Sequence, residues 1–193
     1  MIENALSARR FNFKTKMTVK ALISLVIVAL AVTLPNLAHM AFGAQAGMKW
    51  LPMYLPVILG GCLLGARWGA LIGVSAPLVS FALTSFSGNP MPTLARLPFM
   101  MTELAIFAVI AGLFSDKLSV KPLLAFPAVW LAELCGRGVF LACAALFGRA
   151  SGFTAAVVFS QIKFGASGLL VQAVLAPALV IGLKYLIDRE AHE

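Results

Sequence analysis

The stretch that decides the fold runs from Leu51 to Phe114. It reads LPMYLPVILGGCLLGARWGALIGVSAPLVSFALTSF over residues 51–86, SGNPMPTLAR over 87–96 and LPFMMTELAIFAVIAGLF over 97–114. The stretch combines apolar runs of membrane-spanning length with a loop rich in proline and one carboxylate, Glu103, inside an apolar run. Runs of this length and hydrophobicity predict helices that cross a bilayer.

The composition of the whole chain leads to the same class of protein. Of 193 residues, 61% are hydrophobic and 11% are charged, and the mean hydropathy is +0.98. A soluble domain has about 45–50% apolar and about 25% charged residues. A water-soluble fold of this size cannot bury so much apolar surface. The sequence therefore predicts an all-α integral membrane protein, with residues 1–193 forming a single transmembrane domain.

Six transmembrane helices are expected. The second is expected to be short, because its roughly 14 residues rise only about 21 Å across a hydrocarbon core of about 30 Å. With Pro52 and Pro56 it is expected to be irregular or partly covered by neighbouring helices. Pro77 is expected to kink the third helix. A short amphipathic piece, 156–164, is expected to precede the sixth. The expected helices are 19–42, 51–64, 70–86, 97–114, 122–147 and 165–187.

The first apolar run admits two interpretations. Its basic flank, the run Ala21–Leu34 and the small residues of AFGAQA (41–46) resemble a cleavable signal peptide. The basic flank is long for a signal peptide, however, and the apolar run extends to Phe42, which gives about the 20 residues that a span needs. An uncleaved first helix is the preferred interpretation.

The basic residues indicate orientation in a membrane. They lie beside the ends of apolar runs and form no patch with interleaved aromatic residues, so the net charge of +8 does not predict nucleic-acid binding. With the N-terminus inside, ten Lys and Arg side chains fall on the inner side and four on the outer side. Both termini are therefore expected in the cytoplasm.

Four glycines recur at intervals of four residues: Gly61, Gly65, Gly69 and Gly73. In lipid, helices associate through small residues that let their backbones approach closely. The spacing predicts helix packing and turn formation rather than ligand contact.

Enzymatic and metal chemistry find little support. The three cysteines lie in apolar runs without CxxC spacing, so we expect no metal or cofactor. Ser167 lies in a GxSG match, GASG (165–168), but its only possible histidine bases are His39 and His192, which are expected at opposite ends of the bundle. No P-loop motif is present, so ATP-driven work would have to come from a partner. The chain is therefore not expected to be an enzyme.

Polar residues inside the expected helices are the candidate substrate-binding site. Glu103, Arg137 and Gln172 lie on three helices, about 9 Å, 15 Å and 10 Å from their outer ends by helical rise. Asn89 and Arg96 lie near the outer mouth. Because ionisable groups inside a membrane are costly, they indicate function by default. Two interpretations remain open: a pocket that faces outward, or a pair in which Glu103 and Arg137 only neutralise each other.

Glu133 lies one helical turn before Arg137, a spacing that permits an ion pair on one helix face. A structural pair between the two side chains is favoured here over contact with a ligand.

The combination of residues 51–84, GNPMP (88–92) and 97–114 resembles the substrate-binding S components of energy-coupling factor (ECF) vitamin transporters. The likeness is clearest over about a third of the chain. The resemblance implies a multi-pass receptor in a prokaryotic plasma membrane that binds a vitamin or related small polar micronutrient with high affinity. It also implies, as partners, a transmembrane coupling subunit and two cytoplasmic ABC-type ATPases.

The family also implies that the solute is held near the outer face, by helices 4 to 6 and the loops after helices 1 and 3. Those regions contain the five candidate residues named above. One departure concerns docking: S components commonly carry an AxxxA pattern in helix 1, which Ala21, Ala29 and Ala31 do not form. A solitary membrane transporter and a structural membrane assembly protein therefore remain alternatives, and an intramembrane enzyme is disfavoured by the distant histidines.

Overall fold

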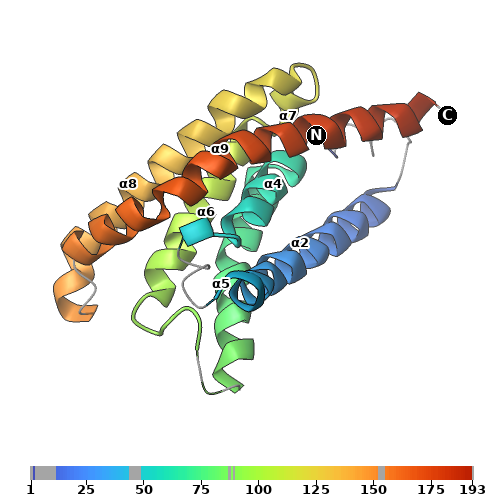
Figure 1. The fold of residues 1–193 in the computed structure, drawn as a ribbon. Helices are drawn as coiled ribbons and strands as arrows, with labels where there is room; N and C mark the ends of the chain where they lie inside the picture. Colours follow the sequence, from blue (N-terminus) through green and yellow to red (C-terminus); the bar gives the residue numbers. More distant parts are fainter. Residues whose placement is uncertain are drawn as a thin grey trace.

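The chain forms a bundle of helices (Figure 1). The computed structural model describes residues 2, 12–43, 49–86, 88, 90–151 and 155–192. Within these residues every helix of eleven residues or more belongs to the bundle, and no strand occurs. The helices are α2 (Phe13–Phe42), α4 (Tyr54–Leu64), α5 (Ala66–Phe86), α6 (Leu97–Leu113), α8 (Ala125–Ser151) and α9 (Ala155–His192). A short helix, α7 (Ser115–Leu118), and a 3₁₀ turn (Pro122–Leu124) connect α6 to α8.

Four of these helices are long and apolar enough to cross a membrane. Their apolar segments are Phe13–Phe42, Ala66–Phe86, Pro122–Phe147 and Phe159–Arg189, and α4 and α6 are shorter apolar helices. The all-helical fold class is confirmed, and the four long helices are what a membrane-spanning protein requires.

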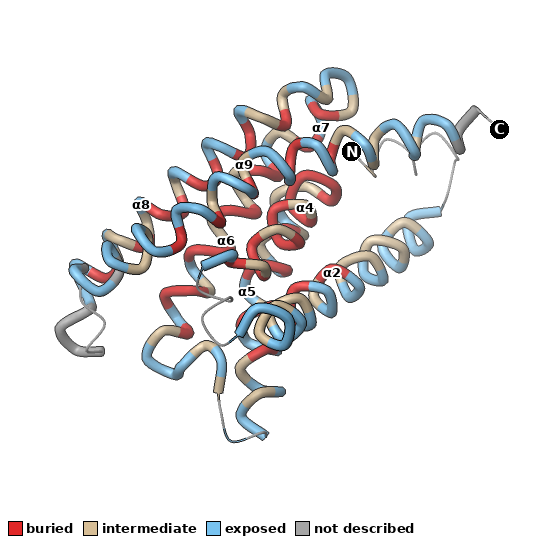
Figure 2. The backbone as a smooth tube through the Cα atoms, in the orientation of Figure 1, coloured by how far each residue is buried: buried red, intermediate tan, exposed pale blue. Residues whose placement is uncertain are grey.

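Helix α6 lies at the centre of the bundle. It packs against α4, α5 and α8, and its buried residues, which include Leu104, Phe107 and Ala108, occur on several of its faces. Helix α4 is still more enclosed: nine of its eleven residues are buried. Figure 2 shows this burial concentrated on α4 and α6, whereas much of α2 is exposed. Burial on several faces shows that neighbouring helices surround α4 and α6.

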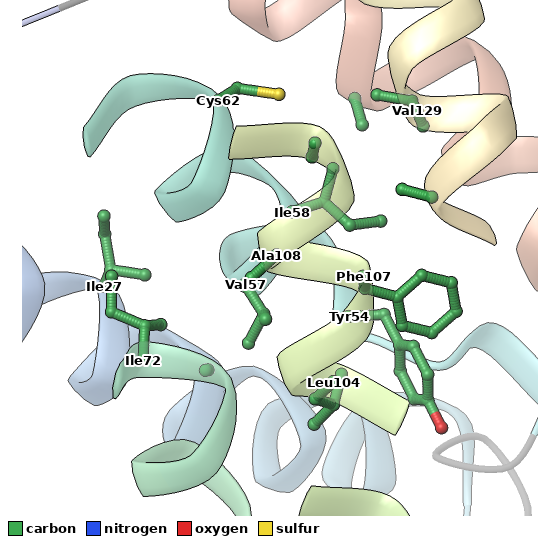
Figure 3. Packing of buried hydrophobic residues seen from close by; sticks show 14 of the residues in the cluster. Ile27, Tyr54, Val57, Ile58, Cys62, Ile72, Leu104, Phe107, Ala108 and Val129 are labelled. Atoms are coloured by element: carbon green, nitrogen blue, oxygen red, sulfur yellow. The ribbon is translucent and has the colours of Figure 1, made fainter. Parts of the chain in front are cut away.

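Glycines make the close packing of α4, α5 and α6 possible. A Cβ atom added at Gly61 would lie 2.3 Å from the carbonyl oxygen of Ala108, and one at Gly73 would lie 2.6 Å from that of Leu104. On α6 itself, a Cβ at Gly112 would lie 2.4 Å from the amide nitrogen of Ala66. Figure 3 shows Ala108 and Leu104 of α6 lying within the core cluster beside Val57. The packing role predicted for the spaced glycines is confirmed.

The turn between α4 and α5 is a single residue, Gly65, with a φ of 87°. This left-handed conformation favours glycine because a side chain there would be strained. Helix α5 consequently begins at Ala66, four residues before the predicted start at residue 70.

The second helix is short, as predicted, but the irregularity predicted for 51–64 is confined to residues 51–53. Pro52 precedes α4, and Pro56 lies in its first turn, where an amide has no partner within the helix. Pro56 therefore breaks no hydrogen bond, and α4 is helical from Tyr54 to Leu64. The irregular backbone lies just before it, where Leu51 has a φ of 50°.

The predicted break between residues 164 and 165 is also wrong. Helix α9 continues from Ala155 to His192, so the expected amphipathic piece 156–164 is its first part. Gly165 and Gly168 are buried within the helix. They act as packing positions in a continuous helix, where an isolated glycine costs only about 1 kcal/mol.

A proline inside α9 leaves a backbone carbonyl without a partner in the helix, and a side chain of α8 supplies the hydrogen bond. Pro177 has no amide hydrogen, so the carbonyl of Ala173, four residues earlier, loses its partner within the helix. The indole Nε1 of Trp130 on α8 donates a hydrogen bond of 3.0 Å to that carbonyl. Neighbouring helices satisfy freed carbonyls in this way in membranes, where water cannot.

This bond can be isolated by substitution. Trp130→Phe is expected to lower the free energy of unfolding by about 1 kcal/mol through the lost hydrogen bond, in addition to a loss of packing. In a Pro177→Ala background the new amide of residue 177 can bond to the Ala173 carbonyl, so the hydrogen-bond part of the loss should disappear. Thermal unfolding of the four proteins in one detergent measures both. Equal losses in the two backgrounds would show that Trp130 acts through packing alone.

Candidate functional site

A buried polar cluster joins α4, α6 and α8. The hydroxyl of Tyr54 donates a hydrogen bond of 2.7 Å to Oε2 of Glu103, and Nη1 of Arg137 lies 2.7 Å from Oε1 of the same carboxylate. The Arg137 guanidinium also lies 5.0 Å from the centre of the Tyr54 ring, in cation–π contact. Glu103 and Tyr54 are 0% and 1% exposed, so the cluster is enclosed in the core.

Each side chain reaches the cluster because of its place on its helix. Tyr54 is the first residue of α4, Glu103 lies in the second turn of α6, and Arg137 lies near the middle of α8. The Tyr54 ring packs edge-on against Phe107, with ring centroids 5.3 Å apart. Figure 3 shows the two rings side by side, with the Tyr54 hydroxyl pointing out of the labelled apolar cluster.

Gln172 joins α9 to the same region. Its Nε2 donates hydrogen bonds of 2.9 Å and 2.8 Å to the carbonyl oxygens of Trp50 and Leu51. The Leu51 carbonyl also accepts the amide of Tyr54, which begins α4. Gln172 therefore fixes the turn that aims Tyr54 at Glu103. Gly168, one turn earlier on α9, admits this turn, because a Cβ there would lie 2.4 Å from the Lys49 carbonyl oxygen.

The remaining predicted residues have different positions. Arg96 lies directly before α6, is half-buried and interacts electrostatically with Glu103 and Tyr54. The segment that carries it is held against α5, because Met91 bonds through its amide to Thr84 and through its carbonyl to Ser80. Asn89 lies outside the described residues.

The predicted structural pair between Glu133 and Arg137 is wrong. Arg137 forms its salt bridge with Glu103 on another helix, and Glu133 interacts with it only through a longer-range electrostatic attraction. The i, i+4 spacing places the two side chains on one face of α8, but it does not decide which carboxylate the guanidinium meets. Here the carboxylate of α6 reaches Arg137 across the helix interface.

Sequence reasoning missed Tyr54. Its signal was available: it is one of only two tyrosines in the chain, and it begins a short apolar helix two residues after Pro52 and two before Pro56. A buried tyrosine hydroxyl usually finds a polar partner. The nearest buried carboxylate in the folded protein is Glu103, 49 positions along the chain, and such a separation could not be read from the pattern.

Several buried polar atoms have no hydrogen-bond partner among the described residues. They include Oε1 of Glu133, Nε of Arg137 and Oε1 of Gln172. Arg137 therefore retains a donor, and the other two retain acceptors. The region therefore offers both a hydrogen-bond donor and hydrogen-bond acceptors. Within the described residues, no group of three or more His, Cys, Asp or Glu side chains is placed to hold a metal ion.

Ser167, from the protease-like GASG match, is exposed on α9, next to the buried packing position Gly168. Close packing of Gly168 against the backbone of Lys49 and Trp50 explains the small residues of the GASG match. In comparisons with protein families, with curated proteins and with solved structures, no match to this chain was found.

Proposed function

We propose that the protein is a membrane-embedded substrate-binding subunit that captures a small polar, vitamin-like solute, as the S components of ECF transporters do. The observation that carries the proposal is the polar cluster of Tyr54, Glu103 and Arg137, buried among apolar helices. Placing ionisable groups inside a membrane bundle is costly. Arg137 retains a donor, and Glu133 and Gln172 retain acceptors, which are what a solute-binding site needs.

The proposal includes the six-span arrangement with both termini in the cytoplasm of a prokaryotic plasma membrane. The two shorter helices, α4 and α6, then complete six passages with the four long ones. Uptake would be driven by a transmembrane coupling subunit and two cytoplasmic ATPases. The solute would lie among α6, α8 and α9, close to Glu103, Arg137 and Gln172, with Asn89 and Arg96 toward the outside.

The direct experiment is to extract the protein in detergent and identify copurifying small molecules by mass spectrometry. A stoichiometric polar metabolite supports the proposal, and the subunits that copurify test the transporter partners. A preparation that contains no solute, and that binds none from a vitamin mixture, would refute it. In that case the membrane assembly protein is preferred.

One observation favours that second candidate. Tyr54 and Arg137 each bind one oxygen of the Glu103 carboxylate. Such contacts between helices are also what a purely structural cluster would make. A structural role predicts that solute is absent from the wild-type protein. It also predicts that substitutions in the cluster change stability alone.

If the cluster binds solute, substitutions in it are expected to lower the affinity of the protein for that solute. Arg137→Ala and Glu103→Ala each remove a charged hydrogen-bonding group, which is expected to weaken solute binding at least tenfold, since such bonds contribute about 1.5–3 kcal/mol. Binding of the copurified solute is measured on variants shown to be folded by size-exclusion chromatography. Lys163→Ala, an exposed residue of α9, serves as the control. Wild-type affinity in both cluster variants would defeat the assignment.

A further inference from the structure

Glu133 is a buried carboxylate for which the described cluster provides no salt bridge. Its exposed fraction is 9%, and its Oε1 atom is fully covered without a hydrogen-bond partner among the described residues. Burying an ionised carboxylate without a partner is costly, and proteins normally pair such a group. Oε1 of Glu133 therefore lacks a hydrogen-bond donor among the described residues.

The charges around Glu133 define what that donor must be. Glu103 and Arg137 form a salt bridge and neutralise each other. Glu133 contributes one further negative charge on the same face of α8, so these three buried side chains together carry a formal charge of −1. Arg96, half-buried before α6, acts electrostatically on Glu103 and Tyr54. The attraction on Glu133 comes instead from Arg137, which Glu103 already engages. Among the described residues Glu133 therefore has no counter-charge of its own.

The guanidinium adds a second requirement. Nε of Arg137 is buried without a partner among the described residues, one helical turn from Glu133. A solute group placed beside these two side chains would meet an acceptor at Glu133 and a donor at Arg137. Nη1 of Arg137 is engaged by Glu103, and among the described residues no hydrogen bond joins Nε of Arg137 to Oε1 of Glu133.

We infer that Glu133 binds a positively charged nitrogen of the solute, an amidinium, an ammonium or a protonated ring nitrogen, while Arg137 Nε donates to a neighbouring acceptor on the same molecule. The inference rests on the proposed solute-binding function and names its substrate class: small monocations with N–H donors. Glu133 is then a binding residue, whereas the salt bridge of Glu103 and Arg137 orients the guanidinium.

Two nearly isosteric probes test the charge. Benzamidine carries an amidinium group, and benzamide carries a neutral amide of the same shape. Binding to the purified full-length protein in detergent is followed by the shift of its thermal unfolding temperature with probe concentration. We expect benzamidine to bind at least fivefold more tightly than benzamide. Equal binding of the two probes, or no binding of benzamidine, would overturn the inference.

The variant Glu133→Gln keeps the shape of the side chain and removes its charge. The preference for benzamidine is expected to fall to about one in this variant and to persist in Asp116→Asn, which removes one negative charge at an exposed position of α7. A preference that survives in Glu133→Gln would refute the role of Glu133. Should that variant not fold, Glu133→Asp, which keeps the charge on a shorter side chain, is expected to retain the preference with weaker binding, and its loss there would overturn the inference.

The outcome is distinguishable from that of the proposed function. A neutral or anionic solute that copurifies with the wild-type protein, and that Glu133→Gln retains, would leave the proposed function intact and refute the cation site. An empty wild-type protein that still prefers benzamidine through Glu133 would refute the solute-capture role and leave the cation site intact.

Discussion

Gly61→Ala is expected to destabilise the protein strongly. The new Cβ would lie 2.3 Å from the carbonyl oxygen of Ala108 and 3.0 Å from its Cα, and both atoms belong to the backbone of the central helix α6. A backbone cannot move aside as a flexible side chain can, so α4 and α6 must separate. Overpacking of a core costs typically 1–3 kcal/mol, and we expect about 3 kcal/mol or more here.

The measurement is thermal unfolding in detergent, with the folded yield taken from size-exclusion chromatography. Gly138→Ala is the matched control, because the same methyl group added to α8 has nothing within 4 Å. That control should be neutral or stabilise the helix by up to about 1 kcal/mol, since alanine is the better helix former. A Gly61→Ala protein as stable as Gly138→Ala would contradict the close approach of α4 to α6.

Removing either member of the Glu103–Arg137 salt bridge should have the second large effect. Glu103→Leu leaves the buried guanidinium without its counter-charge, and Arg137→Met leaves a fully buried carboxylate with only the Tyr54 hydroxyl. Breaking a buried pair in this way costs about 3–5 kcal/mol. The double variant Glu103→Leu/Arg137→Met removes both charges, and it should be destabilised by much less than the sum of the two single changes.

A double-mutant cycle on unfolding free energies measures this coupling, which we expect to be about 2 kcal/mol or more. Additive single effects would argue that the two side chains do not depend on each other. The double variant also separates the two candidate functions. A folded double variant that has lost its solute favours binding, whereas one that keeps a solute places the binding site elsewhere.

Much of the bundle was predictable because its signals are local. Apolar runs indicated each helix, and glycines spaced four residues apart indicated where α4 and α5 pack against α6. The errors came from elements whose outcome depends on context. Pro56 by itself predicts irregularity, but it lies in the first turn, where no helical hydrogen bond is lost. Gly165 by itself predicts a helix start, but α9 continues through this buried position.

The candidate site was predictable only in part. Glu103 and Arg137 were expected to lie at similar depth, and they meet. The partner of Gln172 could not be predicted, because it is the backbone of Trp50 and Leu51, more than 100 positions away. Backbone carbonyls carry no sequence signal. The choice of Arg137 between Glu103 and Glu133 likewise depends on how α6 and α8 pack, which the spacing of charges on one helix does not encode.

The one-residue turn at Gly65 has a consequence for how the chain enters a bilayer. Helix α4 has eleven residues, a length of about 16 Å, which is too short for a segment to be inserted on its own into a hydrocarbon core of about 30 Å. Helix α5 follows without a loop. In the proposed six-span arrangement the two helices would therefore enter as one hairpin during biogenesis, with α5 supplying the hydrophobic length that α4 lacks.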